Sequence, residues 1–287
     1  MRYIHKLMII KERLRNKEIN MKKNDSNEEK ERYLQEIKPY MDKIHEIKIK
    51  EKDLLASLKQ NPEKAAYTNL ALANEMLNLA VCHLEIDTIS RLQFNLKNAG
   101  YLEEGRKLLY KCVIYLEAVV TNRMDAPFSD YEDKLAQIAS FEAAGRYRLV
   151  DKLRKTIALL KIAYESDSKW KWSIVELEGR FAAVAKNLLD LKKVVVNTDP
   201  RSPDYEPTVN HLRMVKELLD YTAHRYREKY EMSTNSKDDF KKGISFLGAL
   251  FRIHTLLWEK DEATEVKKKQ EAWTAKLDAD IKSRKAR

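Results

Sequence analysis

The sequence is poor in the residues that make turns. Its 287 residues include only six glycines and six prolines. The Asn-Gly and Asp-Gly pairs that favour tight β-hairpin turns are absent. The GxxxxGK and GxGxxG patterns, which cradle phosphates, are absent as well. These absences exclude the common glycine-rich phosphate loops and indicate an all-α protein with short connections.

Cysteine is almost as scarce. Cys82 and Cys112 each lie inside an apolar helical run, and no CxxC pattern suggests a zinc knuckle or a redox pair. We expect two buried thiols in a reducing compartment, where a disulfide between them is possible but unnecessary.

Long apolar runs are missing too. No run reaches the roughly 20 residues that a membrane-spanning helix needs. The apolar run at 7–10 is too short for a signal-peptide core, and no small-residue cleavage site follows it. The sequence therefore predicts a cytoplasmic protein. Residues 1–20 are expected to be an upstream extension or a loosely attached helix, since Met21 resembles a natural translation start.

Charge, by contrast, is abundant. Charged residues make up 35% of the chain and the net charge is +10, which suits nucleic acid, an anionic surface or an acidic protein partner. Most basic residues have an acid three or four positions away, as on an ordinary solvated helix face. The basic excess is clearest at 1–23 and 267–287.

The stretch 62–121 is expected to organise the fold as two long helices that meet at Gly100. Two apolar stripes on its first half predict a central helix covered on several sides. Residues 28–60 form a long amphipathic helix, interrupted by Pro39, whose seam could dock on this core or form a homodimer.

The rest of the chain predicts further helices. We expect them at 129–144 (ended by Gly145), 147–165, 169–197, about 207–231, 236–258 and 261 to the C-terminus. The predicted fold is an all-α antiparallel bundle or helical-hairpin array of about eight helices. Its parts are a basic extension at 1–27, a helical domain at 28–260 and a charged helix at 261–287.

Residues 89–117 resemble one hairpin of the tetratricopeptide repeat type. Ile89, Leu92 and Leu96 stand at first-helix apolar positions, and Gly100 stands at the turn. Second-helix positions are filled by Leu102, Gly105, Leu109 and Cys112, with Gly105 where the helices cross. The opening Trp, the Gly after Leu92 and the closing Pro are missing. The resemblance implies peptide or protein binding rather than catalysis.

No catalytic or metal-binding constellation is visible. Asp42-x-x-His45 has no second copy to complete a carboxylate-bridged site, and His211 and His224 lie too far apart on one helix to share a metal. There is no Gly-x-Ser-x-Gly elbow. We therefore predict no enzyme activity, no metal and no cofactor.

The best candidate for partner binding is the loop at 198–207. Three prolines within eight residues predict a rigid, extended connection, and long loops in bundles often carry function. A plain connector is an equally good reading. The candidate residues are Pro200, Arg201, Pro203 and Tyr205, together with Trp170, which could be exposed near a helix start. Other aromatic residues, such as Trp258, are expected in the core.

Our functional hypothesis is a scaffold that binds another protein through grooves between helices. The alternative is a nucleic-acid-binding protein that uses its basic C-terminal helix. Its candidate contacts would be Lys267, Lys268, Lys269, Lys282, Arg284, Lys285 and Arg287, with Trp273 available for stacking.

Overall fold

A computed structural model describes residues 26–124, 126–164 and 169–285. The proposed extension at 1–20 and nearly all of the segment 1–27 lie outside these residues. Within the described ranges the chain forms ten α-helices and no β-strand, which confirms the all-α prediction. The helices are α2 (Ser26–Gln60), α3 (Ala65–Phe94), α4 (Ala99–Val119), α5 (Glu132–Ala136), α6 (Ala143–Tyr164), α7 (Lys171–Asn187), α8 (Leu191–Asn197), α9 (Tyr205–Lys229), α10 (Lys237–Leu256) and α11 (Lys260–Lys285).

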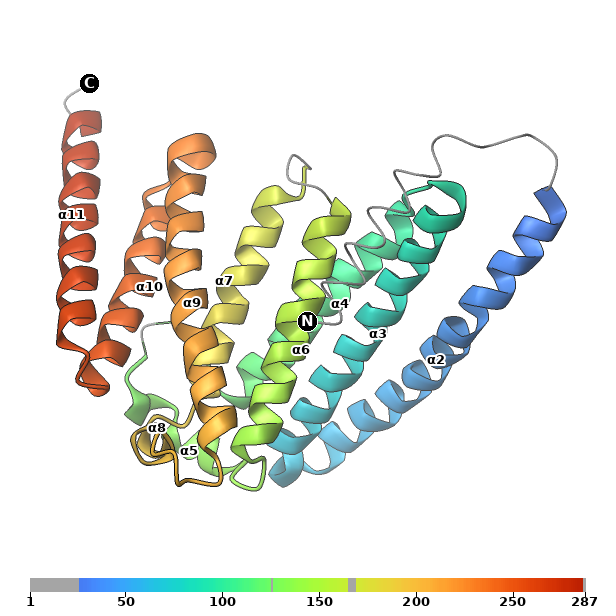
Figure 1. Ribbon diagram of the computed structural model, residues 1–287, viewed down its shortest axis with the longest axis horizontal. Coiled ribbons are helices and arrows are strands. Elements are labelled where there is room, and N and C mark those ends of the chain that lie inside the picture. The colour runs from blue at the N-terminus through green and yellow to red at the C-terminus, as the bar shows by residue number, and fades with distance from the viewer. Residues whose placement is uncertain (1–25, 125, 165–168, 286–287) are drawn as a thin grey trace.

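Three helical hairpins stand side by side and make the body of the molecule (Figure 1). They are α3/α4, α6/α7 and α9/α10. The first helix of each later hairpin packs on both helices of the hairpin before it, so that α6 contacts α3 and α4, and α9 contacts α6 and α7. Helix α2 covers α3 at one end of the row, and α11 covers α10 at the other. The result is a helical-hairpin array with one continuous core.

The apolar seam of α2 packs within the same chain. Ile37, Ile44 and Ile47 are buried, and α2 packs on α3. The Tyr33 hydroxyl lies 3.0 Å from Ser90 Oγ and joins the two helices. Pro39 lies inside α2, which continues through it. Any homodimer formed by residues 28–60 would therefore use the opposite face of α2.

Two helices are covered on several sides. Helix α3 is buried along most of its length, as its two apolar stripes predict. Helix α7 is the second such helix, because α4, α6 and α9 all pack on it. Nearly every residue from Ile174 to Asn187 is buried, including Glu178, Lys186 and Asn187.

Glycine does not end helices in this protein, contrary to our expectation. Gly100 lies in the first turn of α4, and Gly145 lies inside α6. The left-handed cap of α3 is Asn95, with a φ of 49°, a conformation that asparagine tolerates. Glycine instead permits close packing. At Gly105 an added Cβ would lie 3.3 Å from Leu84 Cδ2, so Gly105 does lie where α3 and α4 approach closely.

Three expected segments are shaped differently. In place of a helix at 129–144 the chain forms a short 3-10 turn, the five-residue α5 and further turns. The expected helix at 169–197 breaks after Asn187, and Asp190 starts α8 by accepting a hydrogen bond from the Lys193 amide. The loop at 198–207 is compact rather than extended, because it forms turns and α9 already begins at Tyr205.

Replacing Gly179 by Ala should destabilise the fold. A Cβ at Gly179 would lie 2.6 Å from the ring of Tyr226, which is buried and cannot move freely. We expect a loss of about 1–3 kcal/mol in unfolding free energy, measured by urea denaturation. The matched control is Gly100→Ala, whose Cβ would meet only Asn98 Oδ1 at 3.6 Å and should change stability by less than about 1 kcal/mol. Equal effects at both sites would contradict this account.

Candidate binding groove between α7 and α10

The structure separates the residues that the sequence predicts for partner binding. Pro200, Arg201 and Pro203 are exposed, and Arg201 pairs with Asp199. Tyr205 is half-buried at the start of α9. Trp170 lies just before the first residue of α7, whereas the loop at 198–207 follows α8, beyond the last residue of α7. Helix α7 has 17 residues and is about 25 Å long. These residues therefore do not form one surface (Figure 1).

Trp170 is half-buried rather than exposed. Its ring lies 4.1 Å from the Arg106 guanidinium carbon and 6.1 Å from the Tyr164 ring, between centroids. The exposed tryptophan is Trp258, which we expected in the core. It follows α10 with a φ of 61° and is 80% exposed.

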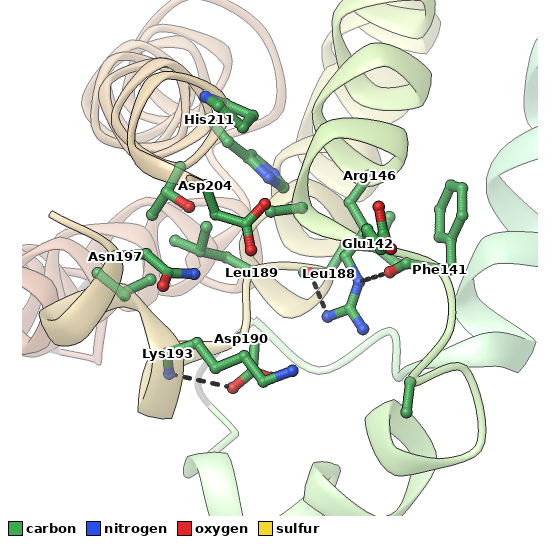
Figure 2. A pocket seen from close by; sticks show the side chains of 15 residues that line it. Phe141, Glu142, Arg146, Leu188, Leu189, Asp190, Lys193, Asn197, Asp204 and His211 are labelled. Atoms are coloured by element: carbon green, nitrogen blue, oxygen red, sulfur yellow. Dashed lines mark hydrogen bonds and ion pairs between the residues drawn. The ribbon is translucent and has the colours of Figure 1, made fainter. Parts of the chain in front are cut away.

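A small cavity of about 80 Å³ lies beneath the connector between α8 and α9 (Figure 2). The connector contributes Asp204 to its lining, α8 contributes Asn197, α6 contributes Arg146, and α9 contributes Pro207 and His211. The prolines that the sequence singled out, Pro200 and Pro203, are not among its lining residues.

Arg146 binds backbone carbonyls in this cavity. Its Nε donates to Phe141 O at 2.7 Å, and its two terminal nitrogens donate to Leu188 O and Ile138 O at 3.3 Å. Burial lowers the pKa of the guanidinium, while Asp190 raises it. The side chain thus joins the end of α7 to the turns between α5 and α6.

His211 is also engaged by the backbone. Its Nε2 lies 2.9 Å from Ala185 O, and burial lowers its pKa to about 4. Because both Arg146 and His211 bond to carbonyls, the cavity is built as a structural joint. This favours the connector reading of residues 198–207, and partner binding there stays a prediction.

Two larger hollows lie in succession along α10. The first, of about 570 Å³, is lined by Glu176, Gly179, Arg180 and Ala183 of α7 and by Asp238, Lys241, Lys242, Ser245 and Phe246 of α10. The second, of about 460 Å³, is lined by Lys186 of α7, by Leu191, Lys192 and Val195 of α8 and by the part of α10 from Ala249 to Leu256. Segments 122–124 and 126–128 border them. Together they form what we call the α7–α10 groove, about 27 Å along α10.

One end of the groove is polar. The Tyr226 hydroxyl donates to Glu176 at 2.8 Å, and Lys242 reaches the same carboxylate at 3.0 Å. Arg180 forms a two-pronged ion pair with Glu117 of α4. These contacts link α7, α9, α10 and α4 around the floor formed by Gly179 and Tyr226, and they pair the charges of Lys242 and Arg180 with carboxylates.

The other end is mainly apolar. Phe128, Leu191, Val195, Ile253 and Leu256 line it, together with three cationic residues, Lys186, Lys192 and Arg252. The described lining residues include no carboxylate. Lys186 is buried, its Nζ donates to Met124 O at 3.1 Å and Ala126 O at 3.2 Å, and burial lowers its pKa to about 8.

Sequence reasoning missed this groove because its walls are about 60 residues apart in the chain. A weak signal was present in α10, where Ser245 and Ala249 stand four residues apart. That spacing puts two small side chains on one helix face, but it does not say which helix stands opposite.

The C-terminal helix offers fewer nucleic-acid contacts than expected. Trp273 is 4% exposed and packs near Phe240 and Arg227, so it is not available for stacking. Lys269 pairs with Asp220 at 3.1 Å. The exposed candidates are Lys267, Lys268 and Lys282. The side chains of Arg284 and Lys285, and all of Arg287, lie outside the described residues.

Two features of the described residues bear on other classes of site. They hold no cluster of three or more His, Cys, Asp or Glu side chains placed to bind a metal ion. Among the helices described here, none is long and apolar enough to cross a membrane. Cys82 and Cys112 are both buried and free, as the sequence predicts.

The fold and the groove define a helical-hairpin protein with an elongated surface hollow. Residues 29–281 match the TP0443 family, so the chain belongs to that family. No curated protein and no solved structure matched it. The resemblance of residues 89–117 to a tetratricopeptide hairpin is not tested by these comparisons and stays a prediction.

Replacing Arg146 should weaken the joint beneath the connector. Arg146→Met removes the donors of three buried carbonyl contacts, and each unsatisfied group costs about 1–3 kcal/mol. We expect a loss of at least about 3 kcal/mol in urea denaturation. Arg148→Met changes an exposed arginine of the same helix and should have little effect. A matching loss in both variants would show that the carbonyl contacts are unimportant.

Protonation of His211 should make the free energy of unfolding depend on pH. Its folded-state pKa of about 4 lies below its ordinary value of 6.5, so the unfolded chain takes up the proton first. The contribution of neutral His211 to the free energy of unfolding is fully present above about pH 6.5. It is lost, by about 3 kcal/mol, as the pH falls toward 4. His211→Gln keeps a donor for Ala185 O and should flatten this part of the profile. An unchanged slope in the variant would refute the assignment to His211.

Proposed function

We propose that the protein is an interaction module that holds an elongated segment of another protein in the α7–α10 groove. The observation that carries the proposal is the alignment of two hollows along α10. Successive turns of α10 line both hollows, with α7 opposite the first and α8 and the end of α7 opposite the second. Each hollow is within the range of about 300–1,000 Å³ typical of ligand sites.

The composition of the groove supports a protein ligand. Apolar residues dominate one end and paired charges the other, and protein interfaces combine an apolar core with a polar rim in this way. A segment laid along the groove could use both ends at once, as helices do in grooves of their partners. The tetratricopeptide resemblance, which implies peptide binding, agrees with this proposal.

Two further expectations belong to the same proposal. The protein would act in the cytoplasm, in keeping with two free, buried thiols. Self-association through residues 28–60 would use the outer face of α2, where Leu34, Met41 and Ile49 are 59%, 43% and 50% exposed. Those side chains are spread over about four helical turns rather than gathered in one patch. Binding of a partner in the groove is therefore better supported than self-association through α2.

Nucleic-acid binding is the alternative proposal. Its support is the exposed lysines of α11, Lys267 and Lys268, which could contact phosphates. Such binding would weaken steeply with added salt, whereas apolar contacts in the groove would persist.

Affinity capture with two matched variants should test the groove. Val195 lines its apolar end and is 48% exposed, whereas its neighbour Val196 is 69% exposed and does not line it. The tagged full chain would capture proteins from its own cells after nuclease treatment and in moderate salt, with mass spectrometry as the readout. We expect a partner to be retained by wild type and by Val196→Asn but reduced about tenfold by Val195→Asn.

Thermal melting would first establish that both variants are folded. Recovery that disappears after nuclease treatment would favour the nucleic-acid alternative. Equal recovery by Val195→Asn and wild type would place the contact outside the groove.

A further inference from the structure

A separate cleft of about 380 Å³ lies between α3 and α6, and it shares no lining residue with the α7–α10 groove. Two contacts between sequence-distant residues close its ends. At one end Ser140 N donates to the Tyr67 hydroxyl at 3.1 Å, and at the other Lys152 Nζ donates to Asn78 Oδ1. Tyr67 and Asn78 are separated by about 16 Å along α3. The cleft therefore suits a compact ligand better than a chain that must run past both ends.

The floor and part of the wall of this α3–α6 cleft are apolar. Leu70 and Leu149 are 7% and 8% exposed and form the floor. An added Cβ at Gly145 would lie 2.7 Å from the ring of Phe141, so the glycine lets this ring pack against α6 and line the cleft. Tyr67, which is 41% exposed, contributes a second ring. An apolar or aromatic ligand group placed here would be removed from water.

The α6 side of the cleft also carries two cations without an ion-pair partner. Arg148 and Lys152 stand one turn apart, and the nine lining residues include no Asp or Glu. Among the described residues, no carboxylate lies within ion-pair distance of either side chain. Glu75 acts on Lys152 only through space, because its carboxylate is bonded by Lys50 at 2.5 Å and by Asn78 at 3.1 Å. Burial lowers the pKa of Lys152, and Glu75 offsets this only in part.

Asn74 adds a neutral donor on the α3 side. The two closing contacts join residues 73 and 74 positions apart in the chain, so the same register places Asn74 beside Arg148. Within the described part of the chain, the half-buried Asn74 side chain forms no hydrogen bond. A guanidinium, an ammonium and an amide thus line one cleft, and all three can donate to the oxygens of an acid group.

These two features together discriminate between possible ligands. A cationic ligand would be repelled by Arg148 and Lys152. A neutral ring would cover the apolar lining but leave both cations unpaired. A bare inorganic anion would pair with the cations but leave the rings in water. A molecule that joins an acid group to an apolar body satisfies the whole lining.

We infer that the α3–α6 cleft binds a small organic anion, in which a carboxylate or phosphate group is attached to an apolar or aromatic body. The acid group lies between Arg148 and Lys152 and accepts a hydrogen bond from Asn74. The apolar body lies against Phe141 and Tyr67. This site goes beyond the proposed function, since it is a different place on the molecule and takes a different class of ligand.

Calorimetric titration of the full chain with four small probes tests the inference. Phenyl phosphate and 3-phenylpropanoate are aromatic anions, whereas inorganic phosphate lacks the ring and benzyl alcohol lacks the charge. We expect at least one aromatic anion to bind with a Kd of about 1 mM or below. Its affinity should exceed that of both inorganic phosphate and benzyl alcohol about tenfold. The tighter of the two aromatic anions shows whether the cleft prefers a phosphate or a carboxylate.

Two variants then locate the bound probe. Arg148→Met removes an exposed cation that has no ion-pair partner, so the variant should fold, and we expect it to weaken binding at least about fivefold. Ala71→Leu places a larger apolar side chain in the cleft and should weaken binding by steric exclusion. The matched control is Arg154→Met, which changes an exposed arginine of α6 that does not line the cleft and should leave the affinity within about twofold of wild type.

Three results would overturn the inference. They are no binding of either aromatic anion up to about 10 mM, equal affinity for inorganic phosphate, and wild-type affinity in Arg148→Met. Thermal melting of each variant shows that it is folded, and Ala71→Leu, which keeps both cations, separates loss of the site from loss of charge alone. None of these results bears on the α7–α10 groove, whose own test uses Val195.

Discussion

Backbone carbonyls outside the helices need donors, and buried cationic and amide side chains supply them. Lys186 and Asn187, adjacent at the end of α7, together bond to four carbonyls of residues 121–126. Arg146 donates hydrogen bonds to three further carbonyls, those of Ile138, Phe141 and Leu188. A buried carbonyl without a donor is costly, so these contacts compensate for burying two cations and an amide, and they hold the irregular segments in place.

The groove depends on these same contacts. Residues 122–124 border one hollow and residues 126–128 border the other, and Lys186 and Asn187 bond to carbonyls of both segments. Helix α7 therefore has two roles, because it packs against three neighbouring helices and its last turns position a wall of the groove. A change at the end of α7 would alter the stability of the array and the shape of the binding site together.

Periodicity predicted most of the fold, because apolar stripes report directly which helix faces are buried. The all-α class, the seam of α2 and the covered α3 all follow from it. Breaks such as Asn187 to Asp190 were missed, since no glycine or proline marks them and a side-chain cap at Asp190 starts the next helix. Gly100 and Gly145 were misread as helix ends. Gly100 lies in the first turn of α4, Gly145 lies where a Cβ would meet the Phe141 ring, and Asn95 and Asn235 take the left-handed conformation instead. The groove was beyond prediction because it needs the pairing of α7 with α10, and the charge pattern of α11 did not reveal that Trp273 is buried.

The row of hairpins also has a mechanical consequence. Helix α10 packs chiefly on α9 and α11, and the Lys242–Glu176 ion pair spans the groove to α7. In arrays built from neighbour contacts, small rotations at each joint add up along the row. The groove lies across one such joint, where α9 packs on α6 and α7, so a small rotation there changes the width of the groove with little repacking inside either hairpin. Such elasticity would let one surface accept segments of different girth.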